Sequence, residues 1–539
     1  MSHFTETHAA RSSDQVVVAR NPVTGEMRAQ FDVASVDEVT GALRAARAAQ
    51  PAWARLGVRE RARVLRRFHQ VLFARRRQVA EAIAYETGKA VVEATAAELS
   101  VVLDFARFYA KHAARELRPR TVGSASLAHL RKRIRIERQP YGVVAVISPW
   151  NYPLMLAAGH ILPALVAGNA VLFKPSELTT ATGALLVGLL NEAGVPEGIL
   201  HLLPGGGETG AAITAAGCDK VFFTGSDRTG RAIALACAER LVPCVLELGG
   251  SDPAILLDDA PIDAAAAAIS WGRFSNAGQT CVAPKRVFVV DSAYEPFVAA
   301  LRRELGALQV GPTHQGGEVG PPITDAQHAL LTAQLEDALA RGARVVARVE
   351  VPAEVPEGAV PFFPPTVLTD VPAGARVLTE ETFGPILPVI RARDADHAVQ
   401  LANDSPFGLS ASVWGANKRR AHAVAERLDV GAVVINDVLI AAGMAEVPHG
   451  GMKSSGTGRA HGLAGLHECV RTRTIIEDRF PGLPQPWWFR YGDTLARGLD
   501  DYLRLEHGLT LRERAAGLLG VRRLLPFLWR RDRRGRAHE

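Results

Sequence analysis

The stretch "GVVAVISPW", residues 142–150, is almost wholly apolar and runs into a polar turn. A short apolar run of this kind is typical of a strand that is buried on both faces of a parallel sheet. The same kind of run recurs in "AVLFKPS", "ILHLLPG", "KVFFTGS" and "CVLELGG". Segments with helical spacing separate the runs, at 157–168, 179–193, 208–216 and 228–240. This alternation predicts an α/β fold with a doubly wound parallel sheet over residues 141–250.

The flanking segments carry other patterns. Residues 36–118 have apolar residues at helical spacing with Arg and Glu on the other faces, which predicts helices. From 253 to about 450, the runs "RVFVV", "ILPVIRA", "SASVWG" and "AVVIN" predict the strands of a second α/β domain. The run "RKRIRIERQP" alternates basic and apolar residues, which predicts a strand with one solvated or interface face.

The composition describes an ordinary globular protein of 539 residues, 48% hydrophobic and 22% charged. The five cysteines are odd in number and show no C-x-x-C spacing, so we expect a reducing compartment, the cytoplasm, and no metal site. The first 15 residues lack an apolar core, and no apolar run reaches the length of about 18 that a membrane helix needs. We therefore expect neither a secretory signal nor a membrane span.

The net charge of +6 lies at one end of the chain. Residues 512–539 hold nine Arg against three acidic residues, and the rest of the chain is balanced. A neutral body argues against nucleic-acid binding. The basic segment also contains Leu, Val, Phe and Trp, which leaves two interpretations. Residues 512–536 could form an amphipathic helix, interrupted at Pro526, in peripheral contact with an anionic membrane. Alternatively, they form a solvated tail or a helix packed on the body.

Each predicted strand of the first sheet ends in a polar or glycine-rich turn. Ligands of open parallel sheets bind at the carboxyl ends of the strands, so these turns are candidate binding segments. They are "SPWN" (148–151), "KPSE" (174–177), "PGGGETG" (204–210), "FTGSDRTG" (223–230) and "ELGG" (247–250). In "TGSDRTG" a helix follows small residues, and a helix N-terminus suits a pyrophosphate. Because no G-x-G-x-x-G pattern is present, a plain glycine-rich turn is the alternative.

Several side chains in these segments have two interpretations each. Lys174 and Glu177 could bind a ribose diol or mark a solvated strand exit. Glu247 ends an apolar strand. Burial there would raise the pKa of its carboxyl and suit it as a base. Alternatively, Glu247 is a structural acid whose hydrogen bonds are satisfied. Cys281, at the end of "SNAGQTC", is a nucleophile or an inert buried thiol.

Taken together, the motifs resemble those of the aldehyde dehydrogenase superfamily over roughly residues 20–476. They are "SPWNYPL", "KPSE", "FTGSDRTG", "LELGG", "GQTC", "EETFGP", "NDSPFGLSASVW" and "PHGGMKSSGTGRAHG", in the order and at the separations usual in that family. The resemblance implies a Rossmann-type NAD-binding domain (1–118 and 141–250) and an α/β catalytic domain (251–451). It also implies a β-hairpin oligomerisation element (119–140 and 452–476), hence a homodimer or homotetramer. Residues 477–539 extend beyond the usual family ending.

The resemblance also implies a reaction, the oxidation of a small-molecule aldehyde to its carboxylic acid. Cys281 would attack the aldehyde carbonyl to form a thiohemiacetal, and Asn151 with the Cys281 backbone N–H would form the oxyanion hole. Hydride transfer to nicotinamide would leave a thioester, which water activated by Glu247 would hydrolyse. The presence of Glu247 argues against a variant that passes the thioester to CoA.

The same resemblance assigns the cofactor contacts. Lys174 and Glu177 would bind the adenosine ribose, Gly225 and Ser226 would lie near the pyrophosphate, and Glu381 would bind the nicotinamide ribose. The full set of implied cofactor-binding residues is Trp150, Lys174, Ser176, Glu177, Gly225, Ser226, Gly230, Leu248, Glu381 and Phe383. Because the Glu177 carboxylate would repel a 2′-phosphate, NAD is expected as the cofactor, with NADP as the alternative.

Two departures from the family pattern concern proton transfer. His449 replaces the Phe of a common "PFGG" motif, and Leu463 stands where many hydrolytic members carry a Glu that is thought to help a proton relay. These departures leave the path of the proton open.

The substrate is less constrained than the reaction. The apolar segment "VLIAAGM" (438–444) favours a hydrophobic or medium-chain aldehyde. Two alternatives to an NAD-dependent enzyme are an NADP-preferring semialdehyde dehydrogenase and a catalytically silent relative that acts as a scaffold or binds membranes. The intact Cys281, Glu247 and Asn151 argue against the silent relative.

Overall fold

The computed structural model describes residues 15–483, 485, 487–488 and 491–528. The chain divides into two compact units. The larger unit takes the residues up to 116 together with 140–471, and the smaller unit takes 117–139 together with the residues from 472 onward. The sequence-predicted site residues all belong to the larger unit.

The larger unit begins with a hairpin and a run of helices. The hairpin strands are β1 (Val16–Arg20) and β2 (Met27–Asp32). The helices are α1 (Val36–Arg55), α2 (Val58–Ala74), α3 (Arg76–Thr87), α4 (Val91–Glu93), the π-helix η2 (Ala94–Leu99) and α5 (Ser100–Glu116), which confirms the helical prediction for 36–118. Ser35 and Glu38 form a capping box at the start of α1. Gly88, with φ of 73°, ends α3 in the left-handed conformation.

A six-stranded sheet forms the centre of the first half of this unit, in the order β19-β9-β8-β5-β6-β7. Its parallel strands are β5 (Val143–Ile147), β6 (Ala170–Lys174), β7 (Leu200–Leu202), β8 (Lys220–Thr224) and β9 (Cys244–Glu247). The helices α6 (Pro153–Ala167), α7 (Thr180–Glu192), α8 (Gly207–Ala216) and α9 (Asp227–Glu239) connect them. The predicted parallel sheet is thus confirmed, and every residue of β5, β6 and β8 is buried, which explains their apolar sequences.

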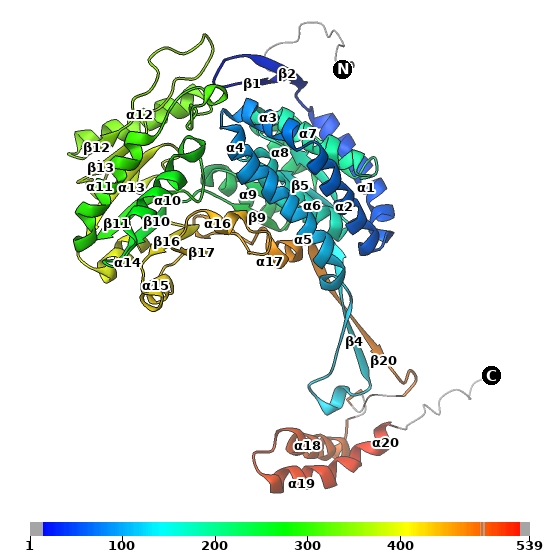
Figure 1. Cartoon of the computed structure of the whole chain (residues 1–539). Coiled ribbons are helices and arrows are strands. Elements are labelled where there is room, and N and C mark those ends of the chain that lie inside the picture. The colour runs from blue at the N-terminus through cyan, green and yellow to red at the C-terminus, as the bar shows by residue number, and fades with distance from the viewer. Residues whose placement is uncertain (1–14, 484, 486, 489–490, 529–539) are drawn as a thin grey trace. The chain divides into compact units, whose positions relative to one another are not determined.

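A second sheet has seven strands in the order β12-β13-β14-β11-β10-β16-β17. Its strands are β10 (Asp252–Leu256), β11 (Pro284–Val290), β12 (Arg344–Arg348), β13 (Thr366–Thr369), β14 (Ile386–Ala392), β16 (Ser410–Trp414) and β17 (Ala432–Ile435). The main helices of this half are α10 (Ile262–Phe274), α11 (Asp291–Ala307), α12 (Asp325–Ala340), α14 (Ala395–Asn403) and α15 (Lys418–Ala425). Figure 1 shows the helices α1 to α9 (blue to teal) gathered around the first sheet and the helices α10 to α15 (green to yellow) around the second.

The structure moves one expected boundary. Residues 452–471 were assigned to the oligomerisation element, but they belong to the larger unit. They contain β18 (Met452–Lys453), β19 (Gly456–Thr457) and α17 (Gly462–Glu468). The physical reason is that β19 adds to the first sheet, where Gly456 and Thr457 pair antiparallel with Glu247 and Leu246 of β9. This pairing brings the segment around His449 and His461 toward the end of β9.

The smaller unit combines a three-stranded sheet, in the order β20-β4-β3, with C-terminal helices. The strands are β3 (Arg120–Val122), β4 (Lys132–Pro140) and β20 (Val470–Asp478), so the alternating run "RKRIRIERQP" forms a strand as predicted. The helices are α18 (Asp493–His507), α19 (Leu511–Gly520), the 3-10 helix η7 (Val521–Leu524) and α20 (Leu525–Leu528). The Glu506 carboxylate accepts hydrogen bonds from the Leu127 N–H and the Ser126 hydroxyl, which links the extension to the β3–β4 connection.

The extension differs from the first of its two interpretations, one amphipathic helix interrupted at Pro526. The α-helical hydrogen bonding changes earlier, at η7, and Pro526 stands at the second position of α20, where its missing N–H has no helical partner to lose. Residues 529–536 of the proposed membrane-contacting segment lie outside the described residues. Of the helices in the described part of the chain, none combines the length and apolar character that crossing a bilayer requires.

Candidate active site

The loop that carries Cys281 has a tightly constrained backbone. Between α10 and Cys281 runs the short helix η5 (Ser275–Gly278), in which Asn276, Ala277 and Gly278 have φ of 51°, 54° and 74°. Three successive residues in the left-handed region are costly, and such strain concentrates at functional sites. A Cβ atom at Gly278 would lie 2.4 Å from the backbone of Gly384, so only glycine fits there.

Hydrogen bonds from three directions hold this loop. The Asn276 N–H donates to the Glu93 carboxylate at 2.9 Å. The Gln279 side-chain oxygen accepts from the Ile323 N–H at 2.9 Å. The Lys285 ammonium donates to the carbonyls of Thr280 and Cys281, at 3.0 and 2.5 Å. The backbone around Cys281 is therefore preorganised.

Asn151 reaches the same loop from the end of β5. Its side-chain amide donates to the Gln279 carbonyl at 3.0 Å, and its own carbonyl accepts from the Asn276 side chain at 3.0 Å. The neighbouring Tyr152 hydroxyl lies 2.7 Å from the Thr280 hydroxyl. The structure thus brings the Asn151 amide, a hydrogen-bond donor, to the loop that carries Cys281, where it binds the residue two positions before Cys281.

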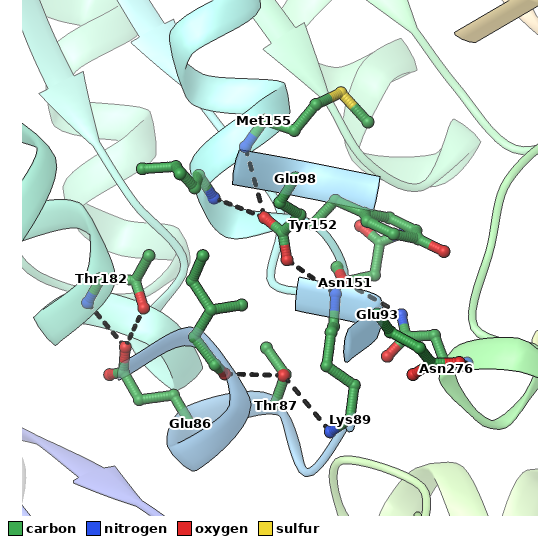
Figure 2. Close-up of polar contacts among 12 residues, drawn as sticks. Glu86, Thr87, Lys89, Glu93, Glu98, Asn151, Tyr152, Met155, Thr182 and Asn276 are labelled. Atoms are coloured by element: carbon green, nitrogen blue, oxygen red, sulfur yellow. Dashed lines mark hydrogen bonds and ion pairs between the residues drawn. The ribbon is translucent and has the colours of Figure 1, made fainter. Parts of the chain in front are cut away.

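A buried ion pair between Lys89 and Glu98 holds the backbone of Asn151 in place (Figure 2). The Lys89 ammonium lies 2.7 Å from a Glu98 carboxylate oxygen and donates to the Asn151 carbonyl at 2.7 Å, and both charged side chains are fully buried. The other Glu98 oxygen accepts from the N–H groups of Leu154 and Met155 at the start of α6. The sequence pattern places Lys89 and Glu98 only within the helical segment 36–118 and gives neither a role. The available signal was three charged residues, Lys89, Glu93 and Glu98, inside the otherwise small and apolar stretch "TGKAVVEATAAELS".

The Cys281 thiol is neutral in this environment. Burial raises the pKa of the thiol to about 12, Lys285 lowers it, and the carboxylates of Asp252, Glu381 and Glu247 raise it further. The side chain nevertheless belongs to a partly exposed residue, unlike the buried Cys218, Cys237 and Cys469. A nucleophilic role therefore requires the thiol to lose its proton as it reacts.

Glu247 stands at the end of β9 and is 4% exposed. Within the described part of the chain, neither of its carboxylate oxygens makes a hydrogen bond of ordinary geometry, but the Ala460 N–H lies close enough to lower the pKa of the carboxyl. Burial raises the pKa of this carboxyl well above its usual value, the Arg459 charge opposes the rise and Glu468 adds to it. A buried acid with high proton affinity suits a base that takes a proton from water.

The residues expected around the adenosine ribose form one group at the end of β6. Lys174 lies 3.6 Å from a Glu177 carboxylate oxygen and donates to the carbonyls of Pro175 and Gly205. Ser176 caps the short helix η4 (Glu177–Thr179). The Glu177 side chain remains about half exposed, at 49%, and so is available to a ligand.

The glycine-rich turn after β8 leads into a capped helix. The Ser226 hydroxyl accepts a hydrogen bond from the Thr229 N–H at the start of α9. A Cβ at Gly225 would lie 2.5 Å from the Phe223 ring, and one at Gly230 would lie 2.4 Å from Leu248. Both glycines are thus required by packing, which places Leu248 directly against α9.

The residues expected around the nicotinamide lie near the Cys281 loop. Glu381 accepts from the Gly250 N–H at 3.0 Å and lies 3.4 Å from the Lys285 ammonium, which also bonds the Cys281 carbonyl. Trp150 and Phe383 meet edge to face, with ring centroids 5.5 Å apart. Lys174, Ser176 and Glu177 contact one another and Lys174 also bonds the Gly205 carbonyl, whereas the contacts of Glu381 extend to the nucleophile loop.

Three buried histidines accompany Glu247. The sequence motifs identify His449 only as a departure from the family pattern, and they do not single out His160 or His461. In the structure His449 lies beside Glu247, with its Nε2 atom 3.9 Å from a carboxylate oxygen. The sequence gave no local indication that these histidines lie near one another, because they come from separate segments of the chain.

Comparisons with known proteins agree on one family. The family model described as "Aldehyde dehydrogenase family" matches residues 8–475. The chain is 39% identical to the 4,4′-diapolycopene aldehyde oxidase of a Methylomonas species, over 92% of this chain and 93% of the relative. It is 37% identical to a succinate-semialdehyde dehydrogenase [NADP(+)] of Deinococcus radiodurans, over 84% of this chain and 93% of that relative. It is 35% identical to a betaine aldehyde dehydrogenase of Rhizobium etli, over 88% and 96%.

Solved structures give the same result. An NADP-dependent enzyme of E. coli is 34% identical with a TM-score of 0.81, over 86% of this chain and 95% of that chain. Lactaldehyde dehydrogenase from Escherichia coli is 31% identical with a TM-score of 0.81, over 86% and 96%.

Proposed function

The chain belongs to the aldehyde dehydrogenase family, an oxidoreductase family that uses NAD or NADP, and we propose that Cys281, Asn151 and Glu247 catalyse the oxidation of an apolar aldehyde with NAD. The observation that carries the proposal is the hydrogen bond of the Asn151 amide to the Cys281 loop, together with a buried carboxyl, Glu247, whose charge acts on the Cys281 thiol. A donor, a thiol and a base are the groups that acyl chemistry at a carbonyl requires.

The residues would act in two stages. In the first, the Cys281 sulfur bonds to the aldehyde carbon as the thiol gives up its proton, and the side-chain amide of Asn151 donates to the developing oxyanion. Loss of a hydride from that carbon leaves a thioester on Cys281. In the second, Glu247 takes a proton from water, the hydroxyl adds to the thioester carbon, and the Cys281 sulfur departs.

The described residues fit a bound dinucleotide. Half-exposed Glu177 and partly buried Glu381 supply carboxylates for two ribose diols, the capped N-terminus of α9 suits a pyrophosphate, and Trp150 with Phe383 supplies an aromatic surface. When bound, the dinucleotide supplies the hydride acceptor. We favour NAD because the Glu177 carboxylate would repel a 2′-phosphate.

Apolar surroundings of Cys281 favour an apolar substrate. Val282, Leu409 and Ala442 form a buried apolar cluster against which Cys281 and Leu439 pack. Leu439 and Ala442 belong to the apolar segment 438–444. Lys285, the cation beside Cys281, is bonded to two backbone carbonyls and to Glu381, which disfavours a carboxylate-bearing semialdehyde. The name of the Methylomonas relative specifies an aldehyde of the hydrocarbon diapolycopene, which supports the same direction.

Chain length is the variable that tests this proposal. We expect kcat/KM to rise as linear aldehydes lengthen, by up to about threefold to fourfold for each CH₂ that the enzyme buries. Succinate semialdehyde, which carries a carboxylate, should be a poor substrate. A preference for succinate semialdehyde with NADP would favour the semialdehyde alternative, and no turnover of any aldehyde would favour the catalytically silent relative.

We further propose self-association through the smaller unit. Strand β20 is at the edge of its sheet, and residues 471–477 of this strand are all exposed. Exposed strand edges of this kind readily pair with another chain. A homodimer or homotetramer is therefore expected, and light scattering coupled to gel filtration measures it.

The C-terminal helices are proposed to contact an anionic membrane. Leu511 and Leu518, seven residues apart on α19, share one helix face and are 88% and 62% exposed. Gly517 and Gly520 lie on the other face, where α18 packs closely. The exposed cations Arg512, Arg514 and Arg522 flank the leucines. Apolar side chains bordered by Arg suit the interface of an anionic bilayer.

The Methylomonas relative adds support for a specialised extension. The matched part of this relative covers 92% of this chain, whereas residues 1–475, up to the end of the family match, make up only about 88% of it. The similarity therefore continues into the segment that the family model leaves unmatched. A shared extension and an apolar aldehyde together favour delivery of the substrate from a lipid phase.

A further inference from the structure

Lys285 places a charge inside the second sheet. It is the second residue of β11, the middle strand of that sheet, and every residue of β11 is buried. The Lys285 side chain itself is 0% exposed. Lysine is almost never fully buried unless its ammonium is paired, because burying a charge without partners is costly. The contacts of this ammonium therefore require an explanation.

The Lys285 ammonium has three partners, as many as it has N–H donors. It donates to the carbonyls of Thr280 and Cys281, at 3.0 and 2.5 Å. Its third partner is the Oε1 atom of the Glu381 carboxylate, at 3.4 Å. The two carbonyls belong to the loop that carries Cys281, and Glu381 belongs to the segment that leads into β14. One side chain thus joins two segments that are far apart in the sequence.

The Glu381 carboxylate is also held by the backbone on the far side of Lys285. Its Oε1 atom accepts from the Gly250 N–H at 3.0 Å, and a Cβ atom at Gly249 would overlap its Oε2 atom. Arg273 is a second buried cation that interacts electrostatically with Glu381, but its N–H groups donate to backbone carbonyls. The Glu381 side chain is 23% exposed, so the carboxylate can meet a ligand while it remains paired with Lys285.

Two other carboxyl groups near the Cys281 thiol differ from Glu381. The Asp252 carboxylate accepts from the Ser410 hydroxyl, and burial raises the pKa of Asp252 to about 7, although the Lys285 charge lowers it. Burial also raises the pKa of Glu247 well above its usual value. Both groups therefore lose their charge at a higher pH than an ordinary carboxyl, which leaves Glu381 as the carboxylate that pairs with Lys285.

The Lys285 charge also acts on the Cys281 sulfur. Burial raises the pKa of the Cys281 thiol to about 12, the Lys285 charge lowers it, and the carboxylates of Asp252, Glu381 and Glu247 raise it. A nearby cation favours a thiolate, whereas nearby carboxylates oppose it. Lys285 and Glu381 therefore have opposite effects on the same sulfur while they pair with each other.

We propose that Lys285 is a positioning residue that ties the Glu381 carboxylate to the Cys281 loop and supplies the positive charge that favours the Cys281 thiolate. This inference rests on the proposed function, because that function gives Cys281 the role of nucleophile and Glu381 the role of a cofactor contact. Lys285 acts through the charge and the backbone of these residues, and it takes up or releases no proton in this role.

The test measures the reactivity of Cys281 in the free protein, before any turnover. Lys285→Met removes the positive charge and keeps a side chain of similar length. Glu381→Gln removes the negative charge and keeps the shape of the side chain. The readout is the rate of iodoacetamide labelling of the Cys281 peptide from about pH 7 to about pH 10, with Cys244 followed in the same sample as the reference.

The two changes should move the labelling rate in opposite directions. Lys285→Met should slow Cys281 labelling by about threefold to tenfold for each unit by which the pKa rises, because the thiolate fraction falls while the nucleophilicity of the thiolate partly offsets this. Glu381→Gln should accelerate labelling by a similar factor, because a carboxylate that opposes the thiolate is gone. A change that only loosened the fold would accelerate labelling in both variants, so a merely structural role predicts a different result.

Lys220→Met is the matched control, since Lys220 is also a buried lysine. A hydrogen bond with Cys237 lowers the pKa of the Cys244 thiol to about 7, burial opposes this, and the Lys220 charge lowers the pKa further. Lys220→Met should therefore shift the labelling profile of Cys244 to higher pH and leave that of Cys281 unchanged. Lys285→Met should do the reverse.

Binding of NAD tests the tie to Glu381. Because the carboxylate loses one of its anchors in Lys285→Met, the Kd for NAD, measured by fluorescence, should rise by about threefold to tenfold, as for the loss of one hydrogen bond. An unchanged Kd would overturn the tie. Lys285→Met that labels at the wild-type rate over the whole pH range would overturn the charge effect, and so would acceleration in both variants.

Folding and the underlying function are checked separately. Thermal melting shows whether each variant is folded, and if Lys285→Met fails to fold, Glu381→Gln decides the question, since unchanged or slower labelling in it contradicts the proposal. Wild type that oxidises no aldehyde would refute the proposed function, while labelling of the free protein still decides the role of the Lys285 charge. Wild type that turns over while Lys285→Met labels and binds NAD like wild type refutes only this inference.

Discussion

Lys89 donates a hydrogen bond of 2.7 Å to the backbone carbonyl of Asn151, from a position where its side chain is fully buried. The same ammonium pairs with Glu98, whose second oxygen accepts from the first N–H groups of α6. One ion pair therefore connects the segment after α3 to both the amide donor and the helix that follows it. Figure 2 shows these contacts converging on Asn151.

Replacing Lys89 by Met should destabilise the larger unit. The change leaves Glu98 buried without its cation, and breaking one partner of a buried pair costs about 3–5 kcal/mol. Thermal melting should show a clearly lower midpoint, with kcat reduced because Asn151 loses an anchor. The double variant Lys89→Met/Glu98→Gln should recover part of the stability. A single variant that melts like wild type would show that the pair has no structural role.

Replacing Cys281 by Ala should abolish aldehyde oxidation and leave NAD binding intact, because the variant loses the nucleophile and keeps the residues that fit the dinucleotide. NADH formation and NAD binding measured by fluorescence provide the two readouts. Cys244→Ala, a change at another partly exposed cysteine, should retain activity. Substantial activity in Cys281→Ala would refute the nucleophile assignment.

Alkylation of Cys281 should accelerate with pH over the whole range from about pH 7 to about pH 10. Burial raises the pKa of this thiol to about 12, so the reactive thiolate fraction grows about tenfold for each pH unit below that value. The rate of iodoacetamide labelling, measured by mass spectrometry of the Cys281 peptide, follows this fraction. A rate that levels off near pH 7 would show a thiolate already formed in the free enzyme.

Replacing Glu177 by Gln should shift the cofactor preference toward NADP. The variant keeps the shape of the side chain and removes the charge that would repel a 2′-phosphate. We expect the ratio of kcat/KM for NAD over NADP to fall by about tenfold, which corresponds to about 1.4 kcal/mol. Glu208→Gln, at an exposed position in the first turn of α8, should leave the ratio unchanged. An unchanged ratio in Glu177→Gln would remove the basis for assigning NAD.

Wild type should float with vesicles that contain anionic lipid and remain unbound with neutral vesicles. Leu511→Glu/Leu518→Glu replaces the exposed apolar face of α19 with like charge and should abolish flotation, without loss of activity on short aldehydes. Leu330→Glu/Leu339→Glu, which changes two exposed leucines of α12, is the matched control and should still float. Equal flotation of the two double variants would refute a membrane contact through α19.

The strands that the sequence predicted correctly share a physical property. Every residue of β5, β6 and β8 is buried, so both faces must be apolar and the pattern is unambiguous. Two strands that it did not predict, β12 and β10, lack a clear strand pattern in the sequence. Strand β12 is exposed along most of its length, and β10 contains Pro253, a residue that argues against a strand.

Sequence alone determined the α/β class, the turns at the strand ends and the residue types of the site, because burial and turn chemistry act on neighbours in the chain. Tertiary structure decided which groups meet. Lys89 supports Asn151 from 62 positions away, and His449 lies 3.9 Å from Glu247 although about 200 residues separate them in the chain. Such contacts depend on how elements pack and on pairing such as that of β19 with β9. A local sequence pattern does not determine how distant elements pack or which strands pair, so the partners of Glu247 became visible only in the folded chain.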